Sequence, residues 1–315
     1  MPSDPFLNPD GSTVRSRLME AVLHALTRIP LSMLYGLGWG AYILAFEVFR
    51  WRRNLARANL RGAFPEKSES EIDALLRQSY RNLGTMIAEA VHGFGATREQ
   101  MRQCVHFENA EVPLQYIRAG RSIVLLAGHF CNWEWLLTGS AARLTVPINA
   151  VYKPQRTQAV DRFLRKARTR FGGNPIPVRT FLHEVMRRRH EARIYALVAD
   201  QTPMRHEDKH WTVFLHRDTA FYTGAGKIAR LLGAPVIFVA MHRTARGQYN
   251  ARFEVLAEPP YCRESDSAVI EAYARALERE IRTSPADWLW VHRKWKYPKP
   301  ETSDAPSHAE ETPVN

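Results

Sequence analysis

The feature that most constrains the fold is a regular alternation between short apolar runs and longer amphipathic stretches. The run 122–127, Ser-Ile-Val-Leu-Leu-Ala, is apolar almost throughout, which indicates a strand buried on both faces of a sheet. Further strands are predicted at 146–152, 193–198 and 235–240, with an edge strand at 252–256. Helical patterns occur at 70–92, 133–143, 159–170, 180–190, 223–232 and 268–283. This order predicts a single α/β domain, a mixed central sheet with helices on both faces.

Residues 29–46 form a stretch of eighteen residues without a charged side chain. At about 1.5 Å per residue this is the shortest helix that crosses a bilayer. The basic side chains that flank it are denser on its C-terminal side, where they are Arg50, Arg52, Arg53, Arg57 and Arg61. The positive-inside tendency then places the rest of the chain in the cytoplasm. A helix across the membrane and a helix in its interface both remain open, and both predict membrane association.

Composition and length define the remaining organisation. We expect a flexible lead-in over 1–14, a membrane-anchor helix with a basic flank over 15–61, a globular domain over 62–298 and a disordered acidic tail over 299–315. The 315 residues are 45% hydrophobic, enough for a full core without a disulfide or metal staple. The three cysteines form no CxxC pair, which indicates a reducing compartment and excludes a cysteine-built zinc site.

The charge balance points to an anionic partner. The 44 Lys and Arg residues exceed the 32 Asp and Glu residues, for a net charge of +12. The last fifteen residues contain four acidic and no Lys or Arg side chains, so residues 1–300 carry +16. Such a surface favours nucleic acid, an acidic membrane, or an acidic or phosphorylated substrate, and composition does not choose among them.

A candidate catalytic pair follows the strand 122–127. Ligand sites in open α/β sheets lie beyond the C-terminal ends of the strands. Gly128 and His129 come directly after this strand, and Glu134 falls on the first turn of the next helix. An imidazole held by a carboxylate is the usual general base near neutral pH. We therefore predict His129 as the base and Glu134 as the carboxylate that holds it.

Three other motifs carry less weight. His183 and His190 are seven residues apart rather than the four of a zinc-protease helix, so no metal site is predicted. The stretch 223–227 lacks the first glycine and the final Ser or Thr of a phosphate loop, and a helix start explains it better. Nothing marks Cys131 as an activated nucleophile, and we interpret it as a small core residue.

Other polar residues form candidate substrate contacts. Asp200 and Gln201 follow a predicted strand and would reach the same crevice as His129. The segment 288–296 interleaves tryptophans with cations, a pattern that suits single-stranded nucleic acid and equally a phosphorylated amphiphile. The residues assigned to substrate binding are Lys153, Arg168, Arg170, Asp200, Gln201, His292, Arg293 and Lys296.

Taken together, these residues resemble the bacterial lipid A biosynthesis acyltransferase family, the late lauroyl and myristoyl transferases of the inner membrane. This family lies within the wider HxxxxD/E lysophospholipid acyltransferase superfamily. The matching pieces, in order over about residues 20–298, are Asn59-Leu60, Phe64-Pro65-Glu66, Gly128-His129 to Glu134, 151–154, 168–172, 199–201, 233–235 and 287–296. The sequence departs from the family in having Lys153 and Lys294 where arginine is common.

The resemblance implies an activity. It implies direct transfer of a fatty acyl chain from acyl-carrier protein, or acyl-CoA, to a hydroxyl of a lipid A precursor, with His129 as base and Glu134 as its partner. It implies a phosphorylated glycolipid acceptor, the anionic inner membrane as the location with the catalytic domain facing the cytoplasm, and no metal or other cofactor. Relatives in the wider family acylate other acceptors, such as glycosylated phospholipids. From a different class, a membrane-anchored nucleic-acid-binding protein stays open, although the sequence contains no nucleic-acid recognition motif.

Overall fold

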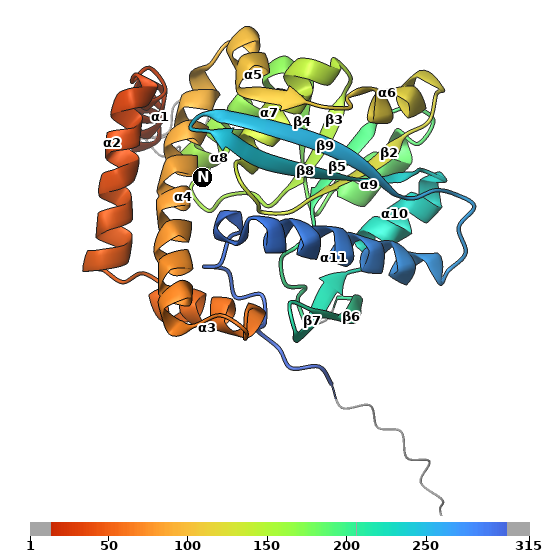
Figure 1. The fold of residues 1–315 in the computed structure, drawn as a ribbon. Coiled ribbons are helices and arrows are strands. Elements are labelled where there is room, and N and C mark those ends of the chain that lie inside the picture. Colours follow the sequence, from red (N-terminus) through yellow and green to blue (C-terminus); the bar gives the residue numbers. More distant parts are fainter. Residues whose placement is uncertain (1–13, 206, 301–315) are drawn as a thin grey trace, which may run out of the picture.

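The computed structural model describes residues 14–205 and 207–300. Their centre is a seven-stranded mixed sheet in the order β1-β9-β8-β2-β5-β3-β4 (Figure 1). Strands β8 and β9 form an antiparallel hairpin, and the other neighbours in the sheet pair in parallel. The bounds are β1 Val105–Phe107, β2 Ile123–Ala127, β3 Ile148–Tyr152, β4 Gly173–Pro177, β5 Ile194–Val198, β8 Val236–Ala245 and β9 Gln248–Ala257. A separate antiparallel pair, β6 (Lys209–Phe214) and β7 (Arg217–Tyr222), follows β5.

The predicted strands are present, with one error of position. All five residues of β2 are buried, as the continuous apolar run requires. The predicted edge strand lies within β9, which is not at the edge, because the three-residue β1 pairs along its outer side. At the opposite edge, β4 has the sequence Gly-Asn-Pro-Ile-Pro, which is typical of a loop; proline is tolerated there because an edge strand has unpaired backbone positions.

Helices account for most of the remaining described chain. Their bounds are α1 Val14–Leu26, α2 Leu31–Tyr42, α3 Arg53–Ala63, α4 Glu69–Gly95, α5 Arg98–Cys104, α6 Glu111–Arg118, α7 Trp133–Leu144, α8 Gln158–Thr169, α9 Phe181–Arg187, α10 Gly224–Leu232 and α11 Ser265–Thr283. A π-helical turn, η1 (Ile43–Val48), extends α2, and two 3₁₀ turns are η2 (Arg170–Gly172) and η3 (Pro285–Asp287). The long helix α4 starts at a capping box formed by Ser68 and Glu71.

The direction of the crossovers decides which face each helix covers. The connections β2–α7–β3 and β3–α8–β4 run one way across the sheet, whereas β4–α9–β5 and the connection from β5 through α10 to β8 run the other way. Right-handed crossovers therefore put α7 and α8 on one face and α9 and α10 on the other. Helix α11 packs against α10, β8 and β9 (Figure 1). The predicted mixed α/β fold with helices on both faces is confirmed.

The apolar N-terminal stretch packs along the α/β domain. Helix α2 and η1 lie beside α4 (Figure 1), and they meet so closely that a Cβ on Gly38 would stand 2.5 Å from the Gly84 carbonyl oxygen. Tyr42 and Phe46 are buried in the same core that continues into the rest of the chain. Within the described residues, Leu31–Val48 is one stretch long and apolar enough to cross a membrane, judged by length and composition.

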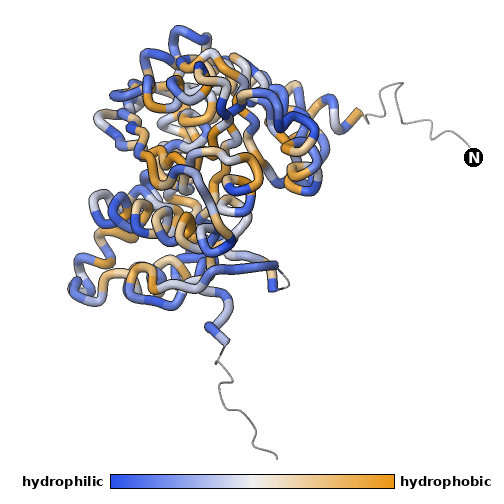
Figure 2. Tube along the Cα trace, turned by 90° about the vertical axis from the view of Figure 1, so that its right-hand side faces the viewer, coloured by the Kyte–Doolittle hydropathy of each residue, from blue (hydrophilic) through white to orange (hydrophobic). Residues whose placement is uncertain are grey.

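The hydropathy of the residues varies across the fold (Figure 2). In Figure 2 the outer turns of the chain are mostly hydrophilic, with hydrophobic segments gathered between them. The predicted lead-in and tail fall almost entirely on residues 1–13 and 301–315, which lie outside the described residues.

Candidate active site

The ends of two neighbouring parallel strands bring a histidine and an aspartate together. In the register of β2 with β5, Ala127 lies opposite Val198, so His129 and Asp200 each follow two residues beyond a paired strand end. The helix after β2 and the helix after β5 cover opposite faces, which makes this pair of strand ends the switch point of the sheet. His129 Nδ1 lies 2.6 Å from Asp200 Oδ1, and the His129 backbone N–H donates to Asp200 Oδ2 at 2.9 Å.

Asp200 is built to remain ionised inside the protein. Its side chain is only 3% exposed, and its Oδ2 also accepts a hydrogen bond from Trp288 Nε1 at 2.8 Å. Burial acts to raise the pKa of this carboxyl, but the charge of His129 and the hydrogen bonds from His129 and Trp288 outweigh burial and lower it. A carboxylate held by three donors is therefore fixed in position and in charge.

His129 has the geometry of a general base. Since a carboxylate only accepts, Nδ1 carries the proton donated to Asp200, and the lone pair of Nε2 faces away from it. Burial acts to lower the pKa of His129, but the charge and hydrogen bond of Asp200 together with the charge of Glu134 raise it. Nε2 lies 3.2 Å from the side-chain nitrogen of Gln201, an exposed residue next to Asp200.

Glu134 is placed differently from the sequence prediction. Its carboxylate accepts two hydrogen bonds from Arg168, at 3.0 Å from Nε and 2.5 Å from Nη2, and both side chains are mostly buried. The hydrogen-bond partner of His129 is thus Asp200 and not Glu134, because α8 brings a guanidinium against the first turn of α7. The predicted hydrogen bond between His129 and Glu134 is wrong. Glu134 still lies close enough for its charge to raise the pKa of His129.

The remaining predicted substrate residues fall into three sets. Gln201 and His292 lie near the pair: His292 Nε2 accepts from the Thr202 backbone N–H at 3.3 Å, and burial lowers its pKa to about 4. Arg170 instead donates to the carbonyl oxygens of Phe94 and Ala96, which fixes the C-terminal end of α4. Three predicted cations have exposed side chains, with no polar contact to the His129–Asp200 pair in the described structure: Lys153, Arg293 and Lys296.

Two further side chains, neither of them among the predicted site residues, act on Asp200 or feel its charge. Trp288 donates to Asp200, and Lys294 is only 2% exposed, with Nζ donating to the Ala220 carbonyl oxygen at 3.0 Å. Burial lowers the pKa of Lys294 to about 7, against the opposing charge of Asp200. The sequence feature that could have pointed to Trp288 and Lys294 is the alternation of aromatic and basic residues over 288–296.

That same segment does not offer a stacking platform for nucleic acid. Trp288, Trp290 and Lys294 are all buried, and the two indole rings pack edge to face with centroids 4.7 Å apart. Bases stack on exposed aromatic faces, so the surface that the nucleic-acid alternative needs is not provided by these residues.

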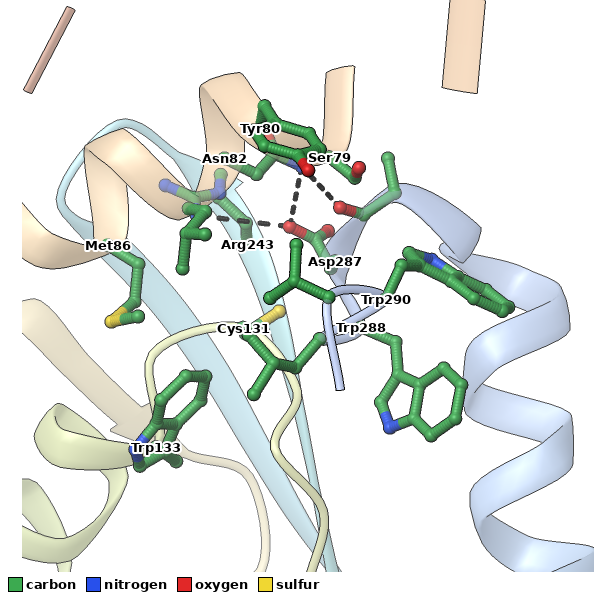
Figure 3. A pocket seen from close by; sticks show the side chains of 14 residues that line it. Ser79, Tyr80, Asn82, Met86, Cys131, Trp133, Arg243, Asp287, Trp288 and Trp290 are labelled. Atoms are coloured by element: carbon green, nitrogen blue, oxygen red, sulfur yellow. Dashed lines mark hydrogen bonds and ion pairs between the residues drawn. The ribbon is translucent and has the colours of Figure 1, made fainter. Parts of the chain in front are cut away.

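A small cavity of about 20 Å³ lies beside Cys131, two residues after His129 (Figure 3). Cys131 lines it with Met86 and Trp288, and Asn82 donates to Asp287 at 2.8 Å beside it. Burial, with the charge of Asp287, raises the pKa of the Cys131 thiol well above its usual value. A buried, protonated thiol is a poor nucleophile, in agreement with the interpretation of Cys131 as a core residue.

A histidine–carboxylate pair beyond the ends of two neighbouring parallel strands is an arrangement found in enzymes that use general-base catalysis. Within that class, residues 12–297 match the family model described as bacterial lipid A biosynthesis acyltransferase, and the chain belongs to this family. It is therefore an acyltransferase, as the resemblance implied.

Curated relatives agree with the family. The chain is 24% identical over 276 residues to a lipid A biosynthesis palmitoleoyltransferase of Escherichia coli K12, covering 87% of this chain and 89% of the relative. It is 22% identical over 278 residues to a lipid A biosynthesis lauroyltransferase of the same organism, with the same coverage. A lipid A biosynthesis acyltransferase of Haemophilus influenzae is 23% identical over 282 residues, or 88% of each chain.

Proposed function

We propose that this acyltransferase moves a fatty acyl group from the thioester of acyl-carrier protein to a hydroxyl of a lipid A precursor, with His129 as the general base. The observation that carries the proposal is the His129–Asp200 pair, in which Nδ1 is tied to a buried carboxylate and the Nε2 lone pair is directed away from it. The names of the curated relatives supply the lipid A precursor as acceptor.

The reaction requires one proton to be moved twice. His129 Nε2 takes the proton of the acceptor hydroxyl while the hydroxyl oxygen bonds to the thioester carbonyl carbon. A tetrahedral oxyanion forms. The oxyanion collapses, the C–S bond breaks, and the leaving thiolate takes the proton back from the imidazolium. The acceptor hydroxyl displaces the Gln201 amide from Nε2, which leaves that amide free to donate a hydrogen bond to the oxyanion.

The Glu134–Arg168 pair supports the base through its charge. The Glu134 carboxylate raises the pKa of His129, so it stabilises the imidazolium that forms after proton transfer. The two-point contact with Arg168 holds this carboxylate in place. Arg168 is therefore engaged within the site, and phosphate binding falls to the exposed cations Lys153, Arg293 and Lys296.

The packing of α2 supports a position at the membrane surface. One side of α2 and η1 lies on α4, whereas the other side exposes a row of large apolar side chains, namely Met33, Leu37, Leu44 and Val48. A helix attached along its length to a polar body cannot cross the bilayer alone. We place it in the interface of the inner membrane, apolar side inward, with the catalytic domain in the cytoplasm.

An acyl-transfer assay tests the proposal. Purified protein is mixed with an acyl-carrier-protein thioester and a lipid A precursor in micelles, and the product is identified by mass spectrometry. His129→Ala should lower kcat by about 10²–10⁴-fold, the usual effect of losing a general base. A folded His129→Ala protein with an unchanged rate would contradict the role of His129.

Parallel reactions test the two substrates. Acyl-CoA replaces the carrier thioester in one, and a glycosylated phospholipid replaces the lipid A precursor in another. Faster transfer from acyl-CoA would reassign the donor. Product on the phospholipid alone would reassign the acceptor while leaving the role of His129 intact.

A further inference from the structure

A second cavity has a volume of about 370 Å³. None of its lining residues lines the cavity beside Cys131. The second cavity is bordered by the end of α1, the end of α4 and the C-terminal half of α8. Four basic side chains and two aromatic rings define its character: His24, Arg28, Lys166, Arg170, Phe94 and Phe163. Among the described residues that line it, none carries a carboxylate.

The cations of this cavity are not neutralised by the protein. On the same helix, Arg162 is paired with Glu20 of α1 at 2.6 Å. One turn further, Lys166 is exposed, and so is Arg28 across from it; neither has a carboxylate within ion-pair distance in the described parts of the chain. Arg170 donates hydrogen bonds to two backbone carbonyl oxygens, which hold its guanidinium at the cavity. These carbonyl groups carry no net charge, so they do not neutralise the guanidinium. The site therefore favours an anion.

The walls favour an anion that has an apolar part. Phe163 is buried at the base of the cavity, where its ring meets His24 and Phe94 edge to face at centroid distances of 5.2 and 5.6 Å. A free inorganic anion gains nothing from such rings. An amphiphile gains contact for its glycerol and upper acyl carbons while its phosphate meets the cations.

The outer face of α1 indicates where that amphiphile comes from. Val14, Leu18 and Val22 repeat every four residues on one side of the helix and are 70%, 66% and 48% exposed. His24, near the end of α1, and Arg28, just beyond the end of this helix, line the cavity. When the apolar row enters the acyl region of a leaflet, these basic side chains reach the level of the lipid phosphates.

We propose that this cavity binds the headgroup phosphate of an anionic membrane phospholipid, at a site separate from the acceptor site at His129. Bound there, the lipid joins α1 to α8 and holds the N-terminal helix against the catalytic body at the membrane surface. Arg170, which the sequence assigned to substrate binding, belongs to this cavity.

Calorimetric titration with a short-chain phosphatidylglycerol below its micelle concentration tests the site on the full-length protein. The wild type should bind one lipid saturably. Arg28→Glu with Lys166→Glu should weaken binding by about tenfold or more, because two phosphate-facing cations are reversed. A control with the same charge change, Arg143→Glu with Arg179→Glu, uses exposed arginines outside the cavity and should bind like the wild type.

The outcomes separate the ligand sources. Equal weakening by both double variants would show diffuse electrostatic attraction and overturn the site, as would equally tight binding of inorganic phosphate. Acyl transfer is then measured in phospholipid-free micelles. An unchanged acceptor KM in the Arg28→Glu, Lys166→Glu protein supports a separate phospholipid site, whereas a raised KM would assign the cavity to the acceptor. Arg28→Gln with Lys166→Gln serves as a milder pair should the charge reversal impair folding, with thermal unfolding as the check.

Discussion

Replacing Asp200 by Asn changes one atom at the centre of the proposed base. The oxygen that accepts from the His129 backbone, at 2.9 Å, and from Trp288, at 2.8 Å, must remain an oxygen, because both partners are donors. The amide nitrogen then takes the position that faces His129 Nδ1 at 2.6 Å. Two N–H groups cannot face each other, so the proton of the imidazole moves to Nε2, where the base needs a lone pair.

The size of the effect follows from this change of tautomer. We expect kcat for Asp200→Asn to fall by about 10²–10⁴-fold, which spans the loss of a general base and the loss of a correctly oriented histidine in other enzymes. The fold should survive, since the shape of the side chain and two of its three hydrogen bonds are kept.

The pH profile gives an independent measurement. The active form of His129 is neutral, and its pKa is raised above the ordinary 6.5, so kcat/KM of the wild type should rise with pH through a value above 6.5. Without the Asp200 charge, burial dominates and lowers the pKa of His129, so the limb for any residual activity should move to lower pH. Stopped assays of thiol release across pH 5–9 would resolve both limbs.

Glu134→Gln is the matched control. Glu134 contributes less than Asp200 to the raised pKa of His129 and makes no hydrogen bond to it. This variant should shift the limb in the same direction by a smaller amount. The reasoning is refuted if Asp200→Asn keeps kcat within about threefold of wild type, or if Glu134→Gln shifts the limb further than Asp200→Asn does.

Three other predictions follow from single side chains. Cys131→Ser should transfer acyl groups at a near wild-type rate, because the buried thiol is not the nucleophile. Mass spectrometry of the intact protein should detect no acyl adduct. An inactive but folded variant would contradict direct transfer. Gly38→Ala should lower the free energy of unfolding by about 1–3 kcal/mol, since the new Cβ would lie 2.5 Å from the Gly84 carbonyl oxygen. Denaturant unfolding measures this change. An unchanged midpoint would mean that α2 does not pack against α4 at Gly84. The pKa of Lys294 is lowered to about 7, so above that pH the unfolded chain binds one more proton than the folded chain. The free energy of unfolding should therefore rise with pH from about 7 toward 10. Lys294→Met should reduce the slope of the free energy of unfolding against pH by about one proton, and an equal slope in wild type and variant would disprove the burial of a neutral lysine.

Local pattern was sufficient for the fold class and for one half of the candidate catalytic pair. The continuous apolar run of β2 predicts a central strand, and the position of His129 directly after it predicts a side chain at the mouth of the sheet. Both inferences depend on residues within a few positions of each other, where periodicity is a direct record of burial. Composition likewise indicated an anionic partner, without saying which cations would remain unpaired.

The partner of His129 was decided only by the order of the strands. Glu134 is five residues from His129 and Asp200 is 71, yet Asp200 makes the hydrogen bond because β5 pairs with β2. Nothing in a single sequence states which strands are neighbours, since pairing depends on how all the layers pack at once. For the same reason the arginine that holds Glu134, and the burial of Lys294 in a segment rich in cations, became visible only in the tertiary structure. Sequence placed the base at a strand end, and long-range packing determined which acid holds it.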